Sequence, residues 1–173
     1  MRTVMADADT LTFEHDGAER VRSALSAVDL RRVKGAVAGL QPDQAGIRLH
    51  GIKALRGLLS STGSVGGIAA SILRPACIPV RAILFDKTLA TNWSLTWHQD
   101  RTIVVHERQE VDGFGPWTVK SGPIHVQPPF ELLARMVTIR VHLDAVPGTN
   151  ALLLIAPGPI GLAVSPKPRS LRL

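Results

Sequence analysis

The spacing of apolar residues changes near residue 79, and this change constrains the possible folds more than any other feature. Before it, residues 23–43 carry apolar side chains at close to helical spacing, and Gln41-Pro42 ends that pattern. Two shorter helices are predicted for residues 51–61 and 63–75, the second ended by Pro75. Strands are predicted within residues 79–88, 95–107, 137–144 and 151–158. Helices followed by strands predict an α+β domain with helices on a mainly antiparallel sheet.

Three segments connect or precede these elements. Residues 10–21 predict a short strand and a turn at Asp16-Gly17. Residues 108–129 are rich in glycine and proline and predict a long loop, a feature that tends to be functional or disordered. Residues 129–136 predict one or two turns of helix.

The composition narrows the class of protein. A chain of 173 residues can form one domain with a sizeable core. No apolar run approaches the roughly 20 residues of a membrane helix, and the acidic N-terminus does not have the pattern of a secretory signal. Cys77 is the only cysteine, which excludes an internal disulfide and a cysteine-rich zinc site. We therefore expect a cytoplasmic protein that does not bind membranes.

The net charge of +6 does not predict a nucleic-acid partner. Half of it comes from residues 159–173, which hold three basic residues and no acidic one. The other 158 residues carry the remaining +3, with acids and bases interspersed. A basic stripe with interleaved aromatic residues, which single-strand binding requires, is missing from the sequence.

A histidine and an aspartate two residues apart, His98 and Asp100, provide a candidate metal site. In a strand both would project to the same face, where an imidazole and a carboxylate can hold two corners of a metal site. A second histidine from a distant strand would complete the 2-His-1-carboxylate triad of non-haem Fe(II) oxygenases. The alternative is an ordinary polar pair, because His142 and Asp144 have the same spacing.

The motifs around the two H-x-D pairs indicate which pair is the candidate metal site. ILFDKT, WHQD, GFGPW, HVQPP and RVHLD follow one another before a turn at Asn150 and a strand ending in PG, and FEHDGA and RLHGI come earlier. As a set in this order, residues 12–158 resemble the phytanoyl-CoA dioxygenase family of Fe(II)/2-oxoglutarate-dependent oxygenases, specifically its bacterial members. The resemblance implies a double-stranded β-helix (jelly-roll) core that carries N-terminal helices.

The same resemblance implies a hydroxylase that uses Fe(II), 2-oxoglutarate and O₂ and acts on a small-molecule substrate. By this resemblance His98 and Asp100 are iron ligands, whereas His142 occupies a non-ligand position. Ile83 and Arg140 fall on strands that flank the 2-oxoglutarate pocket of better-known relatives, although their side-chain types differ from those relatives. No catalytic residue beyond the metal ligands is assigned, and the sequence does not indicate an oligomeric state.

The family pattern ends after Gly158. Relatives continue with a serine, a histidine and a basic run, and later carry the distal iron-binding histidine and an arginine for the 2-oxoglutarate carboxylate. Here residues 159–173 read PIGLAVSPKPRSLRL, and no histidine follows His142. We predict one incomplete domain over residues 1–158 that lacks its C-terminal strands, and a disordered tail over 159–173.

A shift of reading frame near codons 158–159 would explain this change. Plausible GC-rich codons for residues 159–170 can give HRLGRVSEAEI in the shifted frame, which continues the family pattern, and the nucleotide sequence tests this idea. With two ligands from one strand, the chain is expected to bind Fe(II) and 2-oxoglutarate poorly. The alternatives are a non-catalytic fragment or small-molecule binding module, and a metal-independent isomerase or acyl-CoA binder.

Several other side chains allow two interpretations. The three tryptophans could line a substrate pocket or belong to the core: Trp93, Trp97 and Trp117. His106 and His125 are interpreted as ordinary loop or strand histidines, and Lys87 and Lys120 as solvated rather than co-substrate-binding lysines.

Overall fold

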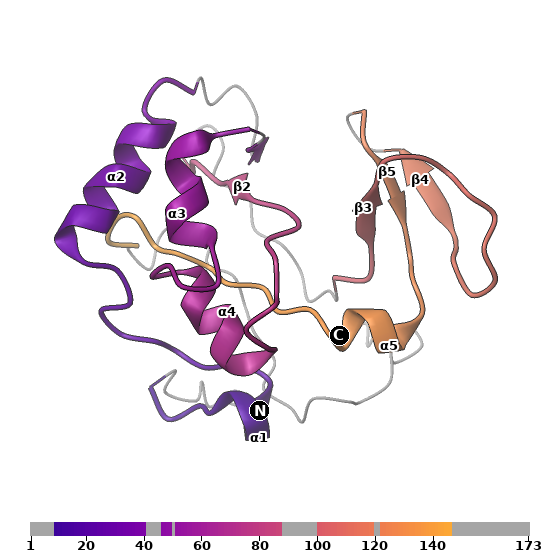
Figure 1. Cartoon of the computed structure of the whole chain (residues 1–173), viewed down its shortest axis with the longest axis horizontal. Helices are drawn as coiled ribbons and strands as arrows, with labels where there is room; N and C mark the ends of the chain where they lie inside the picture. Colours follow the sequence, from indigo (N-terminus) through magenta and orange to yellow (C-terminus); the bar gives the residue numbers. More distant parts are fainter. Residues whose placement is uncertain (1–8, 41–45, 50, 88–99, 120–121, 147–173) are drawn as a thin grey trace, which may run out of the picture. The chain divides into compact units, whose positions relative to one another are not determined.

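The computed structural model describes residues 9–40, 46–49, 51–87, 100–119 and 122–146. They fall into two compact units, which we describe separately. The helical unit contains the described residues of 22–87 together with 136–146, and the sheet unit contains the described residues of 9–21 and 100–135. Helices and small antiparallel sheets are both present, so the predicted α+β class is confirmed (Figure 1). The single domain over 1–158 stays a prediction.

The longest helix, α2 (Ala27–Val37), begins at a side-chain cap. Ser26 Oγ accepts a hydrogen bond of 3.0 Å from the backbone N–H of Asp29, which satisfies one of the helix's free donors. Ser23 has φ +52°, outside the right-handed helical region, so the helix starts later than residue 23. The helix predicted within 23–43 is confirmed, with a shorter extent.

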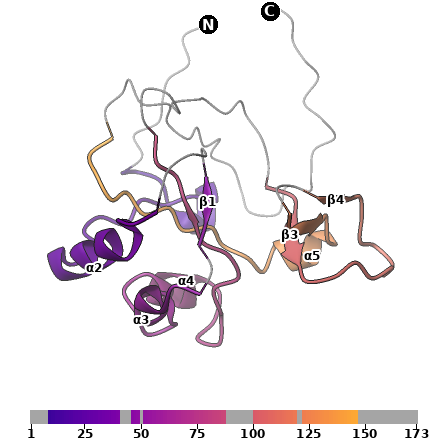
Figure 2. The ribbon, with the colours of Figure 1, turned by 90° about the horizontal axis from the view of Figure 1, so that it is seen from above.

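Three short helical elements pack in the same unit. They are η1 (Lys53–Leu55), α3 (Arg56–Leu59) and α4 (Gly66–Ile72), and Figures 1 and 2 show α3 and α4 side by side. Leu55, Leu58 and Val65 are buried here. The helices predicted within 51–61 and 63–75 are thus confirmed. The connection between α3 and α4 is tight, because a Cβ on Gly66 would overlap the carbonyl oxygens of Leu59 and Ser60.

A two-stranded antiparallel sheet completes the helical unit. In it β1 (Ile47–Arg48) pairs with β2 (Ile83–Leu84), and the backbone N–H of Leu49 donates to Ala82 O at 2.9 Å. The strand predicted within 79–88 is confirmed, whereas β1 was not predicted. The strand predicted for 137–144 is wrong, because this described segment forms no regular element. Alternation makes a segment suitable for a strand, but a strand forms only where a neighbouring strand accepts its hydrogen bonds.

The sheet unit contains three antiparallel strands in the order β3-β5-β4. They are β3 (Ile103–Val105), β4 (Trp117–Val119) and β5 (Ile124–Val126), and α5 (Phe130–Leu133) follows (Figures 1 and 2). The strand predicted within 95–107 is confirmed at Ile103–Val105 only, so Asp100 lies outside it, and the helical turns within 129–136 are confirmed. The loop predicted for 108–129 is wrong, since it contains both β4 and β5. Its glycines and prolines bracket the strands, and Gly122 has φ +99°, which suits a turn.

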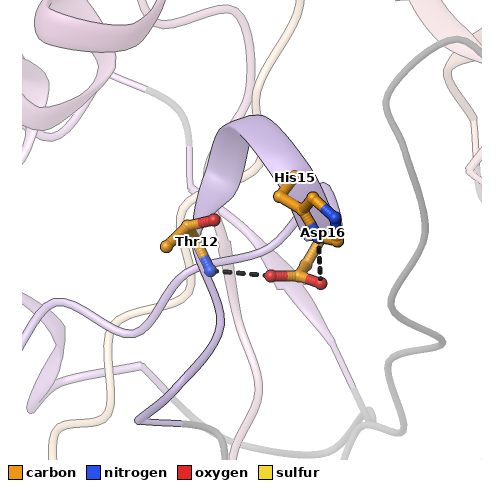
Figure 3. Close-up of polar contacts among 3 residues, drawn as sticks. All are labelled: Thr12, His15 and Asp16. Carbon is orange, nitrogen blue, oxygen red and sulfur yellow. Dashed lines mark hydrogen bonds and ion pairs between the residues drawn. The ribbon is translucent and has the colours of Figure 1, made fainter.

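A single helical turn, α1 (Phe13–Asp16), lies where a strand was predicted within 10–21. The Asp16 carboxylate accepts a hydrogen bond of 2.9 Å from the Thr12 backbone N–H (Figure 3). Gly17 follows with φ +67°, and its N–H donates to Phe13 O at 3.0 Å. The predicted turn is confirmed and the predicted strand is wrong, because this local bonding favours a helical turn.

The buried core is small. In the described part of the chain four aliphatic side chains are buried, together with Pro128: Leu55, Leu58, Val65 and Val126. Thirteen large apolar side chains are exposed there, and the most exposed is Ile78 at 77%. The described strands form two small sheets and not a closed barrel. None of the helices in these ranges has the length and apolar character needed to cross a membrane.

Candidate functional site

One of the two predicted iron ligands can be placed. Asp100 is exposed and precedes β3, which begins at Ile103. Its carboxylate has no hydrogen-bond or ion-pair partner within the described residues, so its oxygens are open to a ligand. His98 lies outside the described residues. The orientation of the pair therefore stays a prediction.

The second H-x-D pair has a different environment. Asp144 is exposed, and its carboxylate accepts a hydrogen bond of 2.7 Å from Lys34 Nζ, which lies on α2. This ion pair neutralises the charge of Asp144 and directs one of its oxygens to the ammonium group. Among the described residues the two aspartates of the repeated motif thus differ: Asp144 has an ion-pair partner there, and Asp100 has none.

The described residues contain no group of three His, Cys, Asp or Glu side chains that could together hold a metal ion. Because His98 is outside these ranges, this finding leaves the predicted pair untested. It does apply to the exposed histidines His15 and His106, which are not part of such a group. His125 is buried in β5, where its Nδ1–H donates to Pro123 O at 3.0 Å, as a structural histidine would.

The two residues predicted to flank a 2-oxoglutarate pocket both belong to the helical unit. Ile83 is half-buried on β2, and Arg140 is exposed in the irregular segment 136–146. Lys87, four residues after Ile83, is half-buried, and this burial lowers the pKa of its ammonium group. The positive charge of Arg140 lowers that pKa further. The charges of Lys87 and Arg140 therefore interact, and both residues belong to the helical unit.

The sequence interpretation expected Lys87 to be solvated, and in the structure this side chain is half-buried. The sequence indicates the partial burial of Lys87 only weakly, through the apolar run AILF that comes before it. Nothing in the sequence shows that Lys87 and Arg140 interact.

A hollow of about 270 Å³ lies in the sheet unit. Its apolar walls come from Val105, Val111, Phe114 and Trp117, and the rim includes His106, Glu107 and Gln109. The Arg108 guanidinium lies 5.6 Å from the centroid of the Trp117 ring, within range of a cation–π contact. Trp117 lines this hollow, and its predicted role in a substrate pocket stays a prediction. Trp93 and Trp97 lie outside the described residues.

A larger and more polar hollow, of about 400 Å³, lies in the helical unit between α2 and the α3–α4 connection. Asp29 and Arg32 line it, and they form an ion pair of 3.6 Å with each other. The Oγ of Ser64, also in the lining, is buried without a hydrogen bond within the described part of the chain. The paired charges leave this hollow with little to attract a ligand.

No protein-family model, curated protein or solved structure matches the chain. The resemblance to phytanoyl-CoA dioxygenases therefore depends on the ordered motifs in the sequence.

Proposed function

We propose that the protein is an Fe(II)/2-oxoglutarate-dependent dioxygenase of the phytanoyl-CoA dioxygenase type that acts on a small molecule. The observation that carries the proposal is the contrast between its two H-x-D aspartates. Asp100 offers an exposed carboxylate without a partner in the described residues, whereas Asp144 is paired with Lys34. The motif that the family resemblance selects is also the one whose carboxylate can accept a metal.

The residues fit the metal that the family uses. An imidazole from His98 and a carboxylate from Asp100 are ligands that suit Fe(II). Bound iron, together with 2-oxoglutarate and O₂, supplies the oxidising chemistry that hydroxylates an unactivated C–H bond. Asp100 would provide a negative charge three residues before β3. Two protein ligands leave the other metal positions to water and co-substrate, so we expect weak iron binding.

The 2-oxoglutarate part of the proposal rests on the sequence resemblance, which assigns Ile83 and Arg140 to the co-substrate pocket. Both residues belong to the helical unit, and Asp100 belongs to the sheet unit.

The jelly-roll core is also part of the proposal. A jelly roll consists of two antiparallel sheets, and every described strand pairs antiparallel. The antiparallel pairing of the strands supports a fold of this class.

The experiment measures succinate formed from 2-oxoglutarate in air, with Fe(II) and ascorbate, at increasing imidazole concentrations. Free imidazole can take the position of a third nitrogen ligand. We expect slow turnover that rises with imidazole in the wild type and disappears in Asp100→Asn. The matched control is Asp144→Asn, which changes the same residue of the other motif. It should keep the wild-type response, because loss of its exposed pair with Lys34 costs less than about 1 kcal/mol.

Two results would count against the proposal. One is equal succinate formation by the wild type and Asp100→Asn, since the carboxylate would then have no part in the reaction. The other is no succinate above the protein-free control at any imidazole concentration.

A non-catalytic small-molecule binding module is a second candidate. The apolar hollow beside Trp117 favours it, because such a hollow binds ligands without a metal. If this candidate is right, ligand binding will persist after chelation of metals, and His98→Ala will leave it unchanged.

A further inference from the structure

We propose that the hollow formed by Val105, Val111, Phe114 and Trp117 binds an uncharged aromatic ring of a small molecule. The hollow belongs entirely to the sheet unit, and all its lining residues lie between positions 105 and 117. Val105 ends β3 and Trp117 begins β4, so two strands of one sheet position its walls.

The shape and chemistry of the walls favour a flat ring. Phe114 and Trp117 present aromatic surface, and aromatic rings prefer offset-stacked or edge-to-face contact with one another. A dry cavity of about 150 Å³ in another protein binds benzene, so a hollow of about 270 Å³ that is open to solvent suits a one- or two-ring system. Val105 and Val111 add branched aliphatic surface at the sides.

Some of the polar groups beside the hollow are paired. Gln109 Nε2 donates to Glu107 Oε1 at 2.7 Å, whereas Trp117 Nε1 is buried without a hydrogen bond within the described residues. Arg108, whose guanidinium lies 5.6 Å from the centroid of the Trp117 ring, donates to Glu110 Oε1 at 2.7 Å. Among the lining residues Glu107 is the only acidic or basic one besides His106, so the lining disfavours an anionic ligand and suits a neutral ring.

The ring is assigned to the enzyme's substrate only if the proposed function is correct. Asp100 and Val105 lie in the same unit, and the five residue-to-residue steps from one to the other span at most about 17 Å. A ring in the hollow would then be within the length of an ordinary small molecule from the metal-binding carboxylate. The substrate class that follows is a small molecule with an aromatic ring at the end remote from the oxidised carbon.

The test uses indole as the probe and is performed without metal, so its outcome does not depend on the iron experiment. Ligand-observed NMR measures the dissociation constant of indole for the full chain and for two variants. Val111→Glu places a charge in the hollow at a side chain that is 51% exposed. Val119→Glu is the matched control, because Val119 is an exposed valine of the same unit, at 69%, that does not line the hollow. The acyclic alcohol 1-hexanol tests the preference for a ring.

We expect Val111→Glu to weaken indole binding by about fivefold or more, because the introduced carboxylate must lose water when the ring binds. Val119→Glu should bind indole like the wild type, and 1-hexanol should bind more weakly than indole. Equal weakening by the two variants would overturn the assignment, as would 1-hexanol binding as tightly as indole. Failure to detect indole binding at millimolar concentration would also overturn it. Far-UV circular dichroism verifies that both variants keep the wild-type fold.

Discussion

The substitution Gly66→Ala tests the packing that holds the helical unit together. Gly66 is the first residue of α4 and is buried. A Cβ at this position would overlap the carbonyl oxygens of Leu59 and Ser60, which belong to the backbone and cannot rotate away. The α3–α4 connection must therefore open to admit a methyl group.

The cost follows from what this opening breaks. The backbone N–H of Val65 donates to Leu58 O at 3.1 Å, and that of Gly63 donates to Ser60 O at 2.8 Å. Loss of two such bonds costs about 2 kcal/mol, and partial exposure of Leu58 and Val65 costs about 1 to 2 kcal/mol more. We expect Gly66→Ala to lower the free energy of unfolding of this unit by about 3 to 4 kcal/mol.

The neighbouring residue of α4 provides the matched control. A Cβ on Gly67 would lie 3.7 Å from Ser61 O, an ordinary contact. Because alanine favours a helix more than glycine does, Gly67→Ala should stabilise the unit by about 0.5 kcal/mol.

Urea denaturation followed by far-UV circular dichroism measures the difference. With a slope of about 2 kcal/mol per molar urea, Gly66→Ala should lower the midpoint by about 1.5 to 2 M. Gly67→Ala should leave the midpoint unchanged or raise it slightly. Equal midpoints for the two variants would refute the close approach of α3 and α4.

Two predictions concern titration. Arg140→Ala should raise the pKa of Lys87, because it removes a neighbouring positive charge, yet this pKa should stay below its ordinary value, since burial is the larger cause. NMR titration measures the pKa of Lys87 in the wild type and the variant. The control is Arg81→Ala, which removes another exposed arginine. An unchanged Lys87 pKa in Arg140→Ala would contradict the interaction of the two cations. Asp16 should titrate below the ordinary aspartate value of 3.8, because its carboxylate accepts the Thr12 N–H and, as a smaller effect, contacts His15. Its contribution to α1 is therefore fully present above pH 3.8 and is lost as the pH falls through the lower folded-state pKa. A carboxyl ¹³C titration with a midpoint at or above 3.8 would contradict this account.

The sequence predicted best those elements whose signals are local. The helical spacing predicted α2 because it acts within a few residues, whereas the Ser26 cap that starts the helix was seen only in the structure. The Asp16-Gly17 turn was predicted for the same reason, since glycine readily adopts the positive φ found at position 17.

Elements that depend on a partner strand were harder to predict. Residues 137–144 alternate like a strand and form none in the structure, whereas β4 and β5 form inside a segment predicted to be a loop. There, Trp117 pairs with Val126 and Thr118 with His125, and such pairing is invisible to a local pattern. The short strand β1 was missed for the same reason.

In the candidate site, too, local features were visible in the sequence and contacts with distant residues were not. The spacing of His98 and Asp100 was visible in the sequence, as was its repetition at His142 and Asp144. The difference between the two aspartates was not visible, because Asp144 is paired with a lysine on a distant helix. The interaction of Lys87 with Arg140 likewise requires the chain to fold before it exists.

The most direct test of the central claim is an anaerobic calorimetric titration of the chain with Fe(II) in the presence of 2-oxoglutarate. We predict weak binding that is stronger with 2-oxoglutarate than without it, is lost in Asp100→Asn and is retained in Asp144→Asn. Unchanged iron binding by Asp100→Asn would contradict the assignment of this carboxylate as a metal ligand.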